Sequence, residues 1–195
     1  MSGRIRDPLV GRDVLFGVML ALTWVLIYEI RLSFGVARFG LAPQLLSTDY
    51  LLGLRRMLGA WIVLLPGGIQ GTLFFFVILI VLRYLLRNRW AAALAFVAVF
   101  TTLKSVGSPH PAIEVATSTF IYGIASFALV RFGLVTLAVA VFVANIMLNV
   151  PATFDFSRWY APNAMSVPVG ILALAVWSFY TALGGQRVIK SEMLE

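Results

Sequence analysis

Long apolar runs, separated by short clusters of arginine, proline and glycine, repeat along the whole chain. A helix needs roughly 20 apolar residues to cross the hydrocarbon core of a bilayer, which is about 30 Å thick. The runs approach that length, so the pattern predicts membrane-spanning helices. Six spans are expected, at about residues 13–33, 70–86, 90–106, 114–130, 133–150 and 165–184.

Residues 47–65 depart from this pattern, because polar and apolar positions separate there with helical spacing. Leu54 and Trp61 fall on one side of a helix, whereas Arg55 and Arg56 fall largely on the other. The pattern favours an interfacial amphipathic helix, ended by the proline and two glycines that follow it. The alternative is that the segment forms the first half of one long, kinked second span.

Composition agrees with the membrane class. Apolar residues make up 61% of the chain and charged residues 12%, against roughly 45–50% and about 25% in soluble domains. Residues 1–195 are therefore expected to form a single integral membrane domain, an all-α, polytopic transmembrane bundle. The net charge of +7 is interpreted as a topology signal and as contact with lipid headgroups, so the expected partner is the bilayer and not nucleic acid.

The arginine cluster of Arg83, Arg87 and Arg89 orients the bundle. It lies in a short connection between two predicted spans, and short arginine-rich connections stay on the cytoplasmic side of a membrane. With six spans, both the N-terminus and the C-terminus are then expected in the cytoplasm.

The only histidine is the first candidate for chemistry. His110 and Glu114 are four residues apart and would share a helical face, where they could bind a metal or relay a proton. Pro109 and Pro111 disfavour a regular helix there, and two ligands are too few for zinc. No metal site is predicted, and an ordinary loop residue is the favoured interpretation. His110 stays a weak cofactor candidate, as a single axial ligand to a porphyrin or chlorin.

Polar side chains within the apolar runs are the second candidate. Asn145 and Asn149 share one face of a predicted span, where they are interpreted mainly as helix-packing groups and secondarily as a substrate site. Glu29 and Arg31 lie near the end of the first span, but at two residues apart they point in different directions. Each is expected to meet the interface or a neighbouring loop.

No enzymatic motif is found. The chain has no GxGxxG, GxxxxGK[ST], HExxH or GxSxG pattern, and no cysteine. The expected protein is not an enzyme. It is expected to bind lipid, and no cofactor is predicted, with quinone or chlorin as the alternatives.

One resemblance comes from the two ends of the chain. The opening GRIRDPLVGRDVLFG, the segment DFSRWYAPN and the segment WSFYTALGGQRV are similar to the membrane-embedded C-terminal region that follows the catalytic domain in some bacterial serine/threonine protein kinases, particularly of the acidobacterial kind. The resemblance is strongest at residues 3–17 and 154–187. It implies a bacterial inner-membrane module without phosphotransfer activity, because the kinase motifs are not in this chain.

Three functions remain open. The first is a non-enzymatic membrane module that anchors, senses or packs against other membrane proteins or against itself. The second is a small accessory subunit of a larger respiratory or photosynthetic complex, in contact with quinone or pigment. The third is a small transporter or channel, which a water-lined cavity around Asn145 and Asn149 would favour.

Overall fold

The computed structural model describes residues 7–40, 53–150 and 155–184. Within these ranges every regular element is a helix, which confirms the all-α part of the predicted fold class. The helices are α1 (Pro8–Phe39), α2 (Leu54–Leu86), α3 (Arg89–Ser105), α4 (Pro111–Arg131), α5 (Leu134–Asn149) and α6 (Ala161–Ala182).

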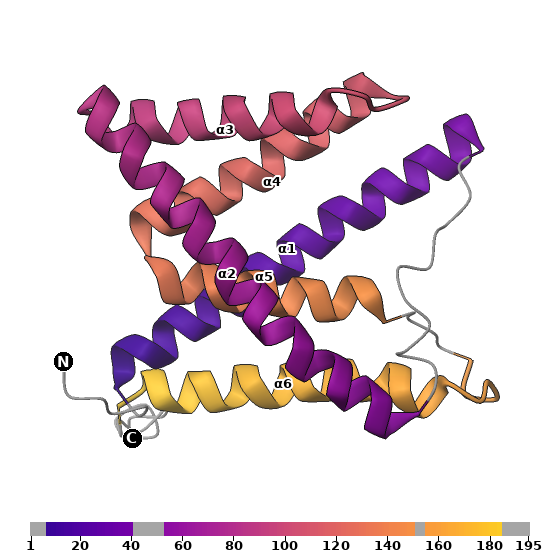
Figure 1. The fold of residues 1–195 in the computed structure, drawn as a ribbon. Coiled ribbons are helices and arrows are strands. Elements are labelled where there is room, and N and C mark those ends of the chain that lie inside the picture. The colour runs from indigo at the N-terminus through magenta and orange to yellow at the C-terminus, as the bar shows by residue number, and fades with distance from the viewer. Residues whose placement is uncertain (1–6, 41–52, 151–154, 185–195) are drawn as a thin grey trace, which may run out of the picture.

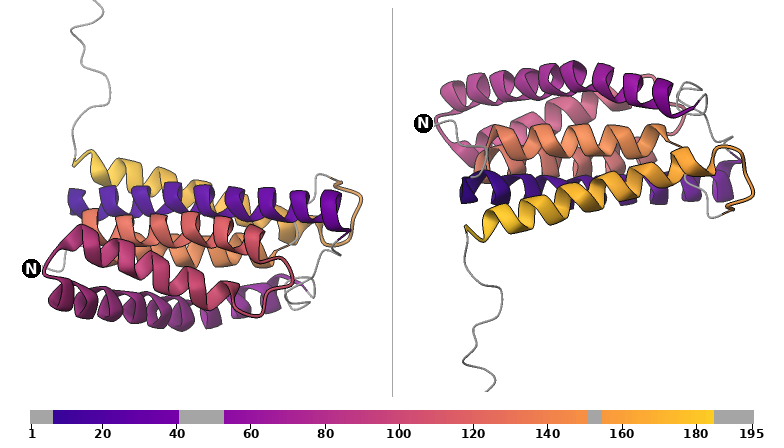
Figure 2. Two further views of the ribbon diagram at one scale, coloured as in Figure 1. Left: turned by 90° about the horizontal axis from the view of Figure 1, so that it is seen from above. Right: turned by 90° about the horizontal axis from the view of Figure 1, so that it is seen from below.

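The helices run back and forth between the two ends of the molecule, and α1 and α2 cross each other obliquely (Figures 1 and 2). α4 and α5 lie in the middle, α1 and α6 cover one side, and α2 and α3 cover the other. The turns that follow α2 and α4 lie at the same end of the bundle as the start of α1. We name this the arginine end (Arg83, Arg87, Arg89 and Arg131) and its opposite the histidine end (Phe39, His110 and Asn149).

Among the described residues, four helices are long and apolar enough to cross a membrane: α1, α2, α4 and α6. α3 and α5 have 17 and 16 residues, and helices of that size are only about 24–26 Å long. Membrane crossing by these two helices, and with it the count of six spans, stays a prediction.

α2 corrects the expected break in the chain. No helix ends at Pro66–Gly68, because α2 continues unbroken through Pro66. Pro66 is exposed, and the buried Gly68 faces Phe142 of α5 with room for a Cβ, which would lie 3.9 Å from the Phe142 Cα. Proline and glycine are tolerated inside membrane helices in this way. Residues 54–65 thus form the start of α2, and residues 47–52 of the predicted surface helix lie outside the described residues.

α1 is longer than the predicted span at both ends. The Asp7 carboxylate caps the first turn by accepting a hydrogen bond from the Leu9 amide at 2.9 Å. The helix ends only at Gly40, whose φ of 62° is readily adopted by glycine. Glu29 and Arg31 therefore lie inside the helix and not at its exit.

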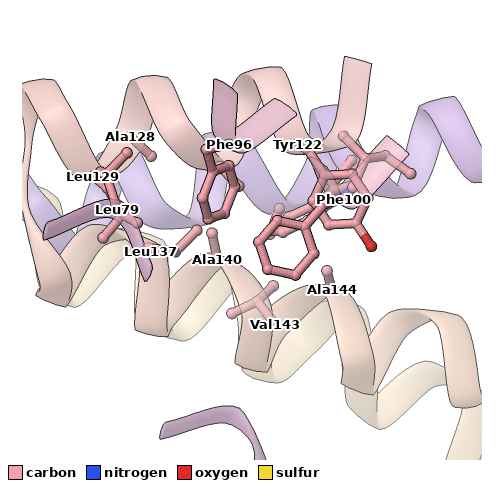
Figure 3. Close-up of a cluster of buried hydrophobic side chains, with 14 of the residues drawn as sticks. Leu79, Phe96, Phe100, Tyr122, Ala128, Leu129, Leu137, Ala140, Val143 and Ala144 are labelled. Carbon is pink, nitrogen blue, oxygen red and sulfur yellow. The ribbon is translucent and has the colours of Figure 1, made fainter. Parts of the chain in front are cut away.

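Two kinds of contact hold the bundle together. Aromatic rings join α3 to α4, because Tyr122 of α4 packs on Phe100 and Phe96 of α3 at centroid distances of 5.1 Å and 6.4 Å. Figure 3 shows these rings above the small side chains of α5. α1 instead packs on its neighbours through glycine. A Cβ at Gly17 would lie 2.8 Å from the Thr136 carbonyl oxygen of α5, and one at Gly11 would lie 2.7 Å from the Ser178 carbonyl oxygen of α6.

Gly17→Ala is expected to lower stability by about 1–3 kcal/mol, because the new methyl group collides with the backbone of α5. Gly123→Ala is the matched control, since an added Cβ there meets nothing within 4 Å. Tryptophan fluorescence during heating in detergent measures both midpoints. Equal midpoints for the two variants would contradict the close approach of α1 to α5.

The absence of cysteine makes the topology testable by single-cysteine labelling. Arg89→Cys lies at the arginine end, and Val106→Cys, where the native side chain is exposed, lies at the histidine end. A membrane-impermeant maleimide added to intact cells should label only Val106→Cys. Labelling of Arg89→Cys from outside would reverse the predicted orientation.

Candidate functional site

A pocket of about 540 Å³ opens at the histidine end, between α1, the start of α4 and the end of α5. We name it the polar pocket. Its charged and polar walls are Glu29, Arg31, His110, Glu114, Asn145 and Asn149. The three pairs that the sequence singles out thus meet in one place, although they come from three separate helices.

An ion pair connects two of these helices. Arg31 of α1 donates from Nη2 to the Oε2 atom of Glu114 in α4 at 2.5 Å. The Glu114 side chain is 15% exposed and that of Arg31 is 39% exposed. The other carboxylate oxygen, Oε1, lies 3.5 Å from the Ser118 hydroxyl. Arg31 was expected to meet the interface or a neighbouring loop, but its partner is the Glu114 carboxylate of α4.

His110 precedes α4 and is half-buried. Its ring packs on Phe39 at the end of α1, with a centroid distance of 4.3 Å. The prolines on both sides place the helix start at Pro111, close to the predicted limit. The imidazole thus forms part of the pocket rim.

The two asparagines have different roles. Asn149 donates from Nδ2 to the Asn145 carbonyl oxygen at 2.7 Å, which holds the last turn of α5. The Asn145 side chain lines the polar pocket and is half-buried. Its amide offers both a donor and an acceptor to a bound molecule.

Three further residues of α1 line the pocket and were not predicted from the sequence. Tyr28, Leu32 and Gly35 line it together with Arg31. Their spacing of three and four residues puts all of them on one helical face, which was the available signal. Gly35 is buried.

The polar pocket offers mainly charged and amide groups. It contains no cysteine, and the only hydroxyls on its wall are those of Tyr28 and Ser108. Among residues 7–40, 53–150 and 155–184, no three His, Asp or Glu side chains are placed to hold one metal ion. A guanidinium, carboxylates and amides can bind polar groups of either charge.

The topology-setting arginines lie away from this pocket. Arg83, Arg87 and Arg89 are exposed at the arginine end, and the Arg89 guanidinium carbon lies 5.7 Å from the centroid of the Trp90 ring. They form a basic rim and take no part in the polar pocket.

Comparison with known proteins adds no family assignment. No protein-family model matches the chain, and neither the curated proteins nor the solved structures contain a significant match. The resemblance to the kinase-linked membrane region therefore stays a prediction.

The contribution of the Arg31–Glu114 ion pair to the stability of the protein can be measured. Glu114→Gln leaves Arg31 without its counter-charge and should cost about 1–3 kcal/mol, between the values for exposed and fully buried pairs. The double variant Arg31→Gln with Glu114→Gln should recover part of the loss. Thermal unfolding in detergent measures all three proteins.

Asp155→Asn is the matched control, because its ion pair with Arg158 is exposed on both sides. The Ser157 hydroxyl and the Arg158 guanidinium hold the pKa of the Asp155 carboxyl below its usual value, so this pair is formed at neutral pH. Its loss should change the unfolding midpoint little. Equal effects of Glu114→Gln and Asp155→Asn would show that the partly buried Arg31–Glu114 pair stabilises the protein no more than an exposed pair does.

Proposed function

We propose that the protein is a non-enzymatic integral membrane module of the sensor kind, which binds a small molecule in the polar pocket. The observation that carries this proposal is the convergence of Arg31, Glu114 and Asn145 on one pocket at the histidine end. Polar side chains are costly in a membrane helix and are kept where they have partners or a function.

The size and accessibility of the pocket support binding. Small-molecule pockets are typically about 300–1,000 Å³ and contain a few placed polar groups, and the polar pocket, at about 540 Å³, has both features. If these residues served only helix packing, they would fill the space between the helices. Instead they leave it open.

The proposed location follows from the arginine rim. With Arg83, Arg87 and Arg89 in the cytoplasm of a bacterial cell, the polar pocket faces the outer side of the inner membrane. A module that resembles the kinase-linked membrane region would then carry its ligand site on the side opposite to the phosphotransfer domain of such kinases. That arrangement suits the reception of an outside signal.

A small transporter is the second candidate, because the cavity forms where Asn145 and Asn149 lie. Toward the arginine end, however, the neighbouring positions are buried: Trp24 is 7%, Tyr122 8% and Ala144 5% exposed. The side chains of these residues close the pocket on the side that faces the arginine end. Transport would need these three helices to separate, so binding without passage is favoured.

Native mass spectrometry after mild solubilisation tests the proposal. The unmodified protein should retain a small non-protein mass, and Leu148→Trp, which fills the polar pocket, should reduce its occupancy about tenfold. Ala98→Trp is the control, because Ala98 lines a separate groove between α3 and α4. Retention that is identical in both variants would contradict binding in the pocket, and pigmented co-purifying subunits would favour the accessory-subunit alternative.

A further inference from the structure

A second cavity adjoins the polar pocket. This apolar groove, of about 520 Å³, lies between α1 and α4 and is lined by Ile27, Ile30, Phe34, Ala116 and Phe120 among others. Arg31 and Ile113 line both the groove and the polar pocket. A charged compartment thus continues directly into an apolar one.

The groove faces the outside of the bundle. Ile30 is 60%, Phe34 54% and Phe120 65% exposed. In a membrane this surface meets lipid chains. A molecule that enters from the bilayer can therefore lay a chain along the groove while its polar end reaches Arg31.

From this arrangement we infer that the ligand is a membrane phospholipid with a primary-amine headgroup, its acyl chain in the apolar groove and its headgroup in the polar pocket. The inference rests on the proposed binding function and names the ligand class for it. Its basis is the match of the pocket to a headgroup that carries one phosphate and one ammonium group.

The phosphate would be bound by Arg31. Glu114 takes one of the N–H groups of this guanidinium, and arginine has five of them. Arg31 reaches the first turn of α4, where Glu114 lies, and the start of a helix carries a partial positive charge. Two independent features therefore favour a negative group at this point.

The ammonium would be bound by Glu29 and Asn145. Glu29 lines the polar pocket and takes part in none of the ion pairs among the described residues. A primary ammonium can donate hydrogen bonds to this carboxylate and to the side-chain amide oxygen of Asn145. A choline headgroup has no N–H to donate, and a glycerol headgroup has no positive charge to offset Glu29.

The test uses the whole protein in detergent with an equimolar mixture of phosphatidylethanolamine, phosphatidylcholine and phosphatidylglycerol of identical chains. Native mass spectrometry should show phosphatidylethanolamine as the main bound lipid on the unmodified protein. Glu29→Gln should reduce this preference about tenfold, because one charge-assisted contact is lost. Ala116→Trp fills the groove and should reduce retention of all three lipids, whereas Ala98→Trp should not.

The outcomes separate this inference from the proposed function. Equal retention of the three lipids by the unmodified protein, or retention unaffected by Ala116→Trp, would overturn the inference. If Leu148→Trp then still abolished binding of a water-soluble molecule, such as free phosphoethanolamine, the pocket would remain a ligand site for a soluble compound. If Leu148→Trp reduced the binding of neither the lipid nor the soluble ligand, both the inference and the proposed function would be overturned.

Discussion

The close seating of α1 on α5 and α6 is the contact on which the other features of the bundle depend. Without side chains at Gly11 and Gly17, the backbone of α1 comes within contact distance of both neighbours. In hydrocarbon, where the hydrophobic effect does not drive helices together, such close packing is a main source of association. It also fixes the rotation of α1. The face with Tyr28, Arg31 and Gly35 is thereby turned toward α4 and α5.

The fold class and the existence of the helices were predictable, because an apolar run of this length can adopt few structures other than a helix in a bilayer. Helix ends were less predictable. Asp7 extends α1 beyond its apolar run, and Pro66 fails to end α2, since proline signals a stop more reliably in soluble proteins than in membrane helices. Local composition cannot show which neighbouring helix supplies the contacts that keep such a segment helical.

The candidate site was predictable only in parts. His110, Asn145 and Arg31 could each be selected as polar groups in apolar surroundings, but nothing in the sequence shows that Arg31 pairs with Glu114 across 83 positions of chain. That contact depends on how α1 packs against α4. The residues from Tyr28 to Gly35 that share one face of α1 were recognisable by their spacing. That this face lines a pocket depends on the position of α5, which the sequence does not show.

The proline inside α2 has a mechanical consequence. Pro66 has no N–H, so the carbonyl of Ile62 lacks its usual helical donor. Bending the helix at this position breaks no further hydrogen bond, which makes it the point of least resistance along 33 residues. The segment before it is held by side-chain packing, since the buried Met57 lies against Ile146 and Val167. The direction of α2 at Pro66 is therefore set by its contacts with α5 and α6.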